Sequence, residues 1–259
     1  MDEVEGGRVN RLLPEVERWL EILYVGVEGA TLRAEDRRKA VEVAALLVEI
    51  ERALARVARS RPVVLVDAAA GKSYVGLLAA RLLLEGAGRP ASVITIEREG
   101  ARVAASRAAA GRLGVTVPVE CRQAEVGAPE AWPDRPSVVA ALHACGPAAD
   151  AVIERAIASR ARHLLLVPCC TGRAVAAARR AEAAAGARGI PPHAPVRNRF
   201  VQALVDAERT LRLEAAGYET EVVELVPPTV TPHNLLWRAR LVGEPARMAR
   251  ARENLGRLG

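Results

Sequence analysis

Short apolar runs alternate with amphipathic segments through the middle of the chain. Segments with helical spacing, at residues 73–84, 100–113 and 148–159, lie between or after these runs. Continuous apolar runs of four to seven residues are typical of strands that are buried on both faces of a sheet. Strands that alternate with crossover helices predict an α/β fold with a doubly wound, mostly parallel sheet. The predicted strands are 63–66, 92–96, 115–121, 138–142 and 163–167.

The first 58 residues show helical spacing instead. One helix is predicted from Leu12 to Leu23 and another from Ala40 to Leu54, and Thr31 followed by acidic residues marks a start for the second. We therefore expect a helical N-terminal cap over residues 1–60 and a main domain over 61–259. A substrate-gripping module is the alternative interpretation of the first segment.

The C-terminal part has a different pattern. A tract rich in Ala and Arg at 173–189 is interpreted as a surface helix, with a mobile insertion as the alternative, and a further helix is expected over 200–216. The last two predicted strands, 219–226 and 235–242, follow each other with only a short connection. Two strands without a helix between them predict an antiparallel pair, here at the edge of the sheet.

The composition and net charge bear on the core and on the kind of partner that the protein could bind. Hydrophobic residues make up 51% of the chain but aromatic residues only 3%, so Ala, Leu and Val must build the core. The net charge is +6, and nearly all basic residues are Arg, interleaved with acids rather than clustered in the sequence. A mildly basic face is compatible with RNA, but charge alone does not establish it.

Cysteine use and the absence of long apolar runs bear on the compartment. The four cysteines, at 121, 145, 169 and 170, lack the spread of a disulfide framework, and the acidic start lacks an apolar leader region. The apolar runs are shorter than the roughly 20 residues that span a bilayer. These features predict a soluble protein in the reducing cytoplasm, without a membrane partner.

The stretch VDAAAGKSYVG at 66–76 ends in the Gly-Lys-Ser triplet of a nucleoside-triphosphate loop. That loop requires a glycine five residues before Gly71, and Val66 occupies the position. A dinucleotide fold requires three glycines in the turn, and only one is present. Asp67 would also repel a pyrophosphate. Both phosphate-binding interpretations are therefore disfavoured.

The acids at the strand ends favour a different ligand. Asp67 closes the first predicted strand, Gly71 turns the chain into a helix, and Glu97 closes the second strand. A carboxylate after the second strand can accept hydrogen bonds from both hydroxyls of a ribose. An acid at the first turn suits the positive end of a ligand. The pattern thus favours a ligand with a ribose and a cationic amino-acid end.

This arrangement resembles the class I S-adenosylmethionine-dependent methyltransferases, over about residues 62–242. Within that class, DAAAGKSY at 67–74 and ALHACG at 141–146 are similar to a methyltransferase-domain family that includes tRNA 2′-O-methylating enzymes. The resemblance implies a Rossmann-like fold and S-adenosylmethionine as cofactor. It implies that the methionine end of the cofactor is lined by Asp67, Ala69, Gly71 and Ser73. It also implies that Glu97 contacts the ribose, and that Glu125 or its neighbours Gln123 and Ala124 contact the adenine.

Ala69 departs from this family, which has glycine there. Alanine disfavours a positive φ, so either the turn differs slightly or the position tolerates a methyl group. Lys72 is one of only two lysines in an Arg-rich chain, and it is expected to pair with Asp67 or to cap a neighbouring loop.

Candidate catalytic groups follow the fourth and fifth strands, where open parallel sheets bind ligands. Histidine titrates near neutrality, so His143 is the predicted base for a hydroxyl acceptor. Cys169 after a proline resembles the nucleophile of RNA cytosine-C5 methyltransferases and is the second catalytic candidate. Structural packing is the alternative for Cys145. A zinc site from these residues and Cys170 is disfavoured, because adjacent cysteines ligate one ion poorly.

The sequence therefore predicts an S-adenosylmethionine-dependent methyltransferase, with RNA slightly favoured as the acceptor and no metal. A small-molecule or protein acceptor is the nearest alternative. A non-catalytic scaffold of the same fold, which binds a nucleotide or a protein partner, is the rival from another class.

Overall fold

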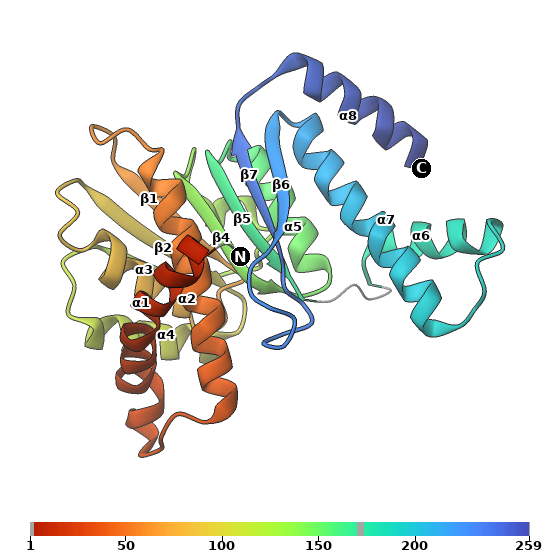
Figure 1. Ribbon diagram of the computed structural model, residues 1–259. Helices are drawn as coiled ribbons and strands as arrows, with labels where there is room; N and C mark the ends of the chain where they lie inside the picture. Colours follow the sequence, from red (N-terminus) through yellow and green to blue (C-terminus); the bar gives the residue numbers. More distant parts are fainter. Residues whose placement is uncertain (1–2, 170–173, 259) are drawn as a thin grey trace.

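A seven-stranded sheet forms the centre of the molecule in its computed structural model, which describes residues 3–169 and 174–258 (Figure 1). The strand order is β3-β2-β1-β4-β5-β7-β6. The first five strands are parallel, whereas β7 pairs antiparallel with both β5 and β6. The predicted doubly wound sheet with an antiparallel edge pair is thus confirmed. The strands are β1 (Val63–Ala68), β2 (Ala91–Glu97), β3 (Val119–Gln123), β4 (Val138–Ala144), β5 (His163–Pro168), β6 (Tyr218–Glu224) and β7 (Leu235–Leu241).

Helices cover both faces of the sheet. One face carries α1, α2, α3 and α4, and the other carries α5 and part of α7. The α6 and α7 helices extend away from the sheet, and α8 packs along α7 (Figure 1). The helices are α1 (Glu3–Leu20), α2 (Ala34–Ala55), α3 (Tyr74–Ala79), α4 (Gly100–Leu113), α5 (Pro147–Ala158), α6 (Ala176–Ala187), α7 (Ala194–Ala215) and α8 (Pro245–Leu258), with short turns η1 (Glu21–Val25), η2 (Gly26–Glu28), η3 (Ala80–Leu84) and η4 (Pro129–Ala131).

Side chains alternate between two hydrophobic cores along the parallel strands. In β1, Leu65 packs into the core beneath α1 to α4, while Val66 packs into the core beneath α5. In β5, Leu165 and Leu166 divide in the same way. Because successive strand residues point to opposite faces, a strand between two helical layers must be apolar throughout. This explains why the sequence shows continuous runs rather than polar–apolar alternation.

The N-terminal helices form a layer on the sheet. Val43, Leu47 and Ile50 of α2 are fully buried in the same core as Leu65 and Val138 of the sheet. The helix begins after Arg33, whose backbone N–H donates to the Asp36 carboxylate at 2.8 Å. The residues 1–60 that were predicted as a cap therefore share one core with the main domain, and the domain boundary itself stays a prediction.

The C-terminal part differs most from the prediction. The helix expected over 200–216 begins at Ala194, and a final helix, α8, had no counterpart among the predicted elements. Within the Ala/Arg tract, α6 forms the expected helix, and its alanines pack against Val201 and Val205 of α7. Of the strands, β3 is the least well predicted, since it begins four residues later than expected.

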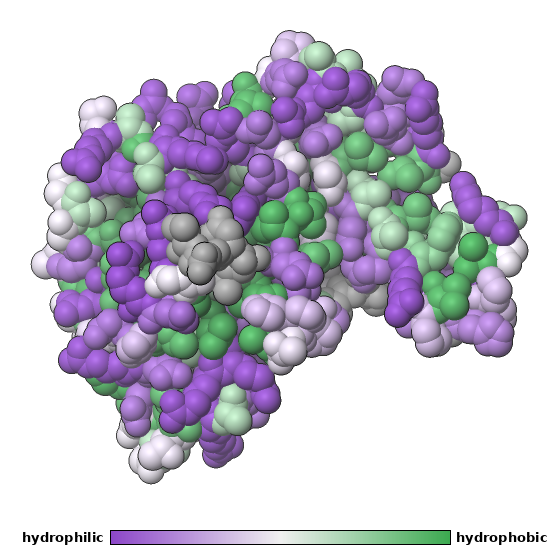
Figure 2. Space-filling model, in the orientation of Figure 1, coloured by the Kyte–Doolittle hydropathy of each residue, from purple (hydrophilic) through white to green (hydrophobic). Residues whose placement is uncertain are grey.

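Hydrophilic residues cover most of the face seen in Figure 2, and apolar residues gather in smaller groups, several of them over α6 and α7. Within the part of the chain that the structure describes, no helix has the length and apolar character needed to cross a membrane.

Candidate functional site

Hydrogen bonds donated by its backbone amides hold the turn that follows β1. The N–H of Ala70 donates to the carbonyl of Ile96 at 3.0 Å, and the N–H of Ser73 donates to the carbonyl of Ala70 at 2.7 Å. The N–H of Gly71 donates to Glu97 Oε2 at 2.8 Å. A phosphate-binding loop must direct such amides at its ligand. These three amides already have protein partners, in agreement with the interpretation that disfavours a triphosphate loop.

Asp67 lies beneath the turn rather than on its surface. Its side chain is 2% exposed, and its Oδ2 accepts a hydrogen bond from the N–H of Gly76 at 2.8 Å. Burial raises the pKa of Asp67 to about 7, the Gly76 hydrogen bond opposes this, and the charge of Glu97 adds to it. A Cβ at Gly76 would lie 3.0 Å from the Asp67 Cβ and from Thr95, so glycine makes room for this carboxyl. Asp67 therefore supports the turn from inside.

Ala69 adopts the left-handed conformation that the sequence led us to doubt. Its φ is +53°, and Gly71 and Ser73 in the same turn each have a φ of +58°. Of the two possibilities, a changed turn or a tolerated methyl group, the structure shows that a positive φ is kept and the methyl group is accommodated. A non-glycine residue in this region costs about 1–2 kcal/mol. The turn is thus held by contacts that outweigh this cost.

Glu97 joins the two strand ends. Its Oε2 accepts from Gly71 N–H and its Oε1 accepts from the N–H of Glu99 at 3.0 Å, while the side chain is 7% exposed. A carboxylate oxygen has the capacity to accept two hydrogen bonds, so each oxygen of Glu97 can still accept one from a ligand. The backbone bonds fix the direction of the carboxylate before any ligand arrives.

A cleft of about 470 Å³ opens over these strand ends. This volume lies within the usual range of sites for small ligands. A ribose-bearing ligand without a pyrophosphate fits the donor set, because Glu97 offers carboxylate oxygens while the amides of the turn are occupied. The lining includes Ala69, Glu97, Arg98, Ala124, Glu125, His143 and Cys145.

His143 stands at an irregularity in β4. Its φ is +60°, and the register with β5 shifts between Leu142 and Ala144. Such bulges redirect side chains and are frequent beside active sites. The His143 side chain is 22% exposed, and its Nε2 lies 2.9 Å from Oε2 of Glu42.

Glu42 comes from α2 and approaches His143 from the helical layer. It is 5% exposed, and Lys39 also contacts it, with Nζ 2.9 Å from Oε2. Burial opposes ionisation of Glu42, but hydrogen bonds from His143 and Lys39 outweigh burial and lower its pKa. An ionised carboxylate accepts only, so Nε2 carries a hydrogen and a neutral imidazole has its free lone pair on Nδ1.

Cys145 and Cys169 are joined by a disulfide, with their Cα atoms 5.4 Å apart. The expectation of four cysteines without a disulfide is therefore wrong. The physical reason is that neighbouring strands β4 and β5 end side by side, which brings together residues 24 positions apart. A bonded sulfur has no thiol to ionise, so a catalytic role for Cys169 requires the reduced form and stays a prediction.

A metal centre finds no support among the described residues. Within 3–169 and 174–258, no three His, Cys, Asp or Glu side chains are grouped as ligands for an ion. Cys170, a member of the zinc site that the sequence disfavoured, lies outside the described residues.

Lys72 contacts the N-terminal segment instead of Asp67. Its ammonium lies 5.7 Å from the ring centroid of Tyr24, and its carbonyl accepts a hydrogen bond from the Tyr24 hydroxyl. The Tyr24 ring also packs edge-on against Tyr74, at 4.7 Å between centroids. Burial, with smaller contributions from Tyr74 and Asp67, raises the pKa of Tyr24 well above its ordinary value. The η1 segment thereby braces the outer side of the turn.

The structure divides the predicted site residues into two groups. Ala69, Glu97, Glu125 and His143 line one cleft, together with Cys145. Gly71 contacts Glu97 but is not part of the lining, while Asp67 is buried beneath the turn. Ser73 is also buried, and its hydroxyl bonds to that of Ser106 at 3.0 Å.

Sequence reasoning missed Glu42 and Tyr24. Glu42 lies on the apolar face of its helix, among residues that are buried on both sides of it in sequence. An acid within such a face is a signal for a buried partner, although the sequence does not identify that partner.

A sheet of this topology, with a carboxylate after the second strand and a cleft over the strand ends, defines a class I methyltransferase fold. A family model described as a methyltransferase domain matches residues 38–176, which is more than half of the chain. The chain belongs to this methyltransferase family. It is accordingly an enzyme whose methyl donor is S-adenosylmethionine.

Solved structures with the same fold differ widely in sequence. The CMeT domain of the citrinin polyketide synthase is 14% identical, with a TM-score of 0.52 over 81% of this chain and 54% of that one. This chain thus spans about half the length of that structure. The SAH-bound magnesium protoporphyrin IX methyltransferase of Synechocystis PCC 6803 is 13% identical, with a TM-score of 0.48 and coverage of 88% and 94%.

The SAH-bound methyltransferase PaMTH1 of Podospora anserina is 12% identical, with a TM-score of 0.49 and coverage of 93% and 97%. A search of functionally curated proteins gave no significant sequence match.

Proposed function

We propose that this methyltransferase binds S-adenosylmethionine in the cleft over β1, β2 and β4, and that His143 accepts the proton of a hydroxyl acceptor. The observation that carries the proposal is the hydrogen bond between Nε2 of His143 and the Glu42 carboxylate, at the lining of the cleft that also contains Glu97. A partly exposed histidine that is oriented by a buried carboxylate beside a ligand cleft is the arrangement expected of a general base.

In the cofactor site, Glu97 accepts hydrogen bonds from the ribose hydroxyls. Glu125 and Ala124 flank the adenine, and Ala69 lies against the methionine end. Asp67, Gly71 and Ser73 hold the turn in its left-handed form, a supporting role that replaces the direct contacts expected for Asp67 and Ser73. Asp67 is too buried for direct contact with a ligand.

S-adenosylmethionine supplies an electrophilic methyl group when bound, so the protein has to position the acceptor and take up its proton. Nδ1 of His143 takes the proton from the hydroxyl while Nε2–H donates to Glu42. The carboxylate stabilises the imidazolium that forms, as a buried acid does for histidine bases in general. Lys39 holds Glu42 from the other side.

RNA remains the proposed acceptor class, with a small molecule or a protein as alternatives. It is supported by the net charge of +6 and by the motif resemblance at 67–74 and 141–146 to tRNA 2′-O-methylating enzymes. A screen for transfer of a labelled methyl group to total RNA, protein extract and metabolites tests it directly. Label confined to the protein or metabolite fraction would reject RNA.

The cofactor site is tested by titration calorimetry with S-adenosylmethionine. Glu97→Ala should weaken binding about tenfold or more, because charge-assisted hydrogen bonds to the ribose are lost. Glu99→Ala is the matched control, since its exposed carboxylate pairs with Arg102. Equal affinities in the two variants would show that the site is misplaced.

The base is tested by turnover once an acceptor is in hand. His143→Ala should lower kcat by a factor of about 10² or more while cofactor affinity changes little. His193→Ala, an exposed histidine at the start of α7, is the control. Unchanged turnover in His143→Ala would remove it as the base.

A further inference from the structure

A second cleft lies at the opposite end of the sheet from the cofactor site. It has a volume of about 480 Å³ and is formed where the chain enters β1, β4 and β5 and leaves β7. Strands of six or seven residues separate the two ends of the sheet by about 20 Å. A ligand in this cleft would therefore not touch a ligand at Glu97. Six arginines contribute to its lining, namely Arg56, Arg61, Arg135, Arg160, Arg162 and Arg240.

The lining carries positive charge without matching acids. Among the residues the structure describes, no Asp or Glu lines this cleft. Arg56, Arg61, Arg160 and Arg162 have no carboxylate within 4.0 Å in that part of the chain, whereas arginines elsewhere, such as Arg180 with Glu208, form close pairs.

The two remaining guanidiniums are only partly neutralised. Arg135 lies 3.9 Å from Asp134, and both side chains are highly exposed. Arg240 binds Glu219 at 2.6 Å, and Glu219 is shared with Arg247 at 3.7 Å.

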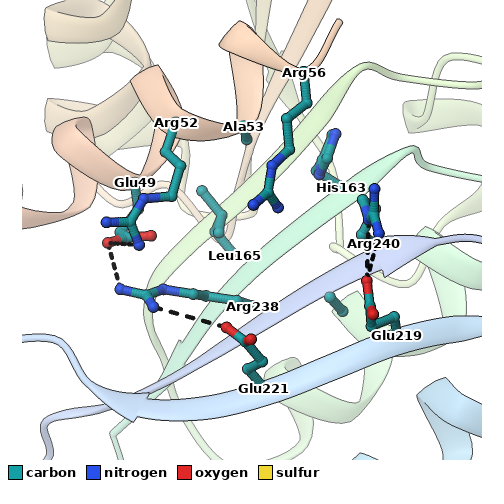
Figure 3. A pocket seen from close by; sticks show the side chains of 11 residues that line it. Glu49, Arg52, Ala53, Arg56, His163, Leu165, Glu219, Glu221, Arg238 and Arg240 are labelled. Atoms are coloured by element: carbon teal, nitrogen blue, oxygen red, sulfur yellow. Dashed lines mark hydrogen bonds and ion pairs between the residues drawn. The ribbon is translucent and has the colours of Figure 1, made fainter.

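An adjoining pocket shows the contrast (Figure 3). There Arg238 bonds to Glu49 at 2.7 Å and lies 3.8 Å from Glu221, so its charge is matched. Arg56, which directly follows α2, reaches into the space between that helix and the sheet, and Figure 3 shows no ion pair for it. Arg56, His163 and Arg240 line both pockets, but the acids Glu49, Glu219 and Glu221 line only the adjoining one. The excess charge is therefore concentrated on the arginine-lined side.

The local backbone adds a second observation. Arg135 and Arg160 have positive φ values, +48° and +54°, in the loops that lead to β4 and β5. Glycine or asparagine would adopt this conformation at lower cost. His163 beside them is buried, and burial together with Arg56, Arg162 and Arg240 lowers its pKa to about 4. Arg135 and Arg160 thus occupy backbone positions where any side chain is disfavoured, and the neighbouring His163 is neutral.

We propose that this arginine cleft, defined by the six arginines named above, binds an oligophosphate group. Guanidinium groups bind phosphate oxygens through paired hydrogen bonds, and several on one wall fit a chain of phosphates better than a single anion. The phosphates could belong to a free nucleotide or polyphosphate, or to an RNA backbone, since the recognising chemistry is the same. The proposal is independent of the cofactor site and of the base.

The test uses the full chain with three probes: inorganic tripolyphosphate, ATP, and a single-stranded RNA of about 20 nucleotides, the last long enough to occupy one or more typical binding sites. Binding is measured by calorimetry or fluorescence at low salt and again at higher salt. The test variant is Arg61→Gln with Arg162→Gln. The control is Arg8→Gln with Arg250→Gln, which removes the same charge at exposed positions in α1 and α8.

The Arg61/Arg162 double variant should bind tripolyphosphate about tenfold or more weakly, and the control should change less than about twofold. Retention of S-adenosylmethionine binding and of the melting temperature shows that both variants fold. Loss of tripolyphosphate or ATP binding only in the test variant supports a small-molecule source. Loss of RNA binding only, with no affinity for the small anions, supports a backbone source.

Two results would overturn the proposal. One is that no probe binds the wild type at about 1 mM in low salt, which corresponds to less than about 4 kcal/mol of binding free energy. The other is that the test and control variants lose affinity equally, because that would reflect net charge rather than this cleft.

Discussion

Ala69 allows a sharp test of how the cofactor turn is built. Its φ of +53° lies in the region where a Cβ meets the following carbonyl, at a cost of about 1–2 kcal/mol. Replacement by glycine removes this cost but adds freedom to the unfolded chain, worth about 0.4–1 kcal/mol. The balance predicts that Ala69→Gly raises the free energy of unfolding by about 0.5–1 kcal/mol. For a chain of this size that is a rise of about 1–4 °C in melting temperature.

The matched control is the neighbouring residue. Ala70 is also partly buried in the turn but does not have a positive φ, so Ala70→Gly should lower the free energy of unfolding by about 0.5–1 kcal/mol. Chemical denaturation of both variants measures the difference in sign. The Ala69 methyl group lines the cleft, so calorimetry with S-adenosylmethionine shows whether its removal also changes affinity. Destabilisation of the same size in both variants would refute a left-handed Ala69.

Three further predictions concern the groups around the cleft. The folded-state pKa of Asp67, about 7, exceeds its ordinary value of 3.8, so the stability that Asp67 contributes is fully present below pH 4 and is lost as pH rises through 7. Between pH 4 and 8 the free energy of unfolding of the wild type should fall by up to about 4 kcal/mol relative to that of Asp67→Asn. The same pH dependence of unfolding in both proteins would contradict this. Glu42→Gln should lower kcat about tenfold while KM for S-adenosylmethionine is little changed, because Glu42 orients His143. Lys39 contacts Glu42 and not His143, so Lys39→Gln should have a smaller effect in the same kinetic assay, and equal effects would argue against positioning by Glu42. The Cys145–Cys169 disulfide closes a loop between residues 24 positions apart, so its reduction should lower the free energy of unfolding by about 3.5 kcal/mol, as measured by melting with and without dithiothreitol. A Cys145→Ser variant that still responds to the reductant would point to another bond.

Local sequence patterns determined the central fold. Runs such as 63–66 and 164–167 are apolar at every position because helices cover these strands on both faces. Burial on both faces is therefore recognisable in the sequence. The same logic placed Glu97 and His143 at strand ends on one edge of the sheet, where both line the cleft. The sequence of α8 shows no comparable apolar pattern, because its residues are mostly polar and only Ala251 is buried.

Tertiary structure alone decided which side chains meet. Glu42 contacts His143 across 101 positions of sequence, and Tyr24 contacts Lys72 across 48. Asp67 was expected to contact the ligand at the first turn, but its side chain is buried near the end of β1 and accepts a hydrogen bond from Gly76. Periodicity reports the environment of one element at a time, whereas these contacts depend on how separate elements pack. The arginine cleft has the same origin, since its residues are dispersed in sequence and gather only where the ends of the strands converge.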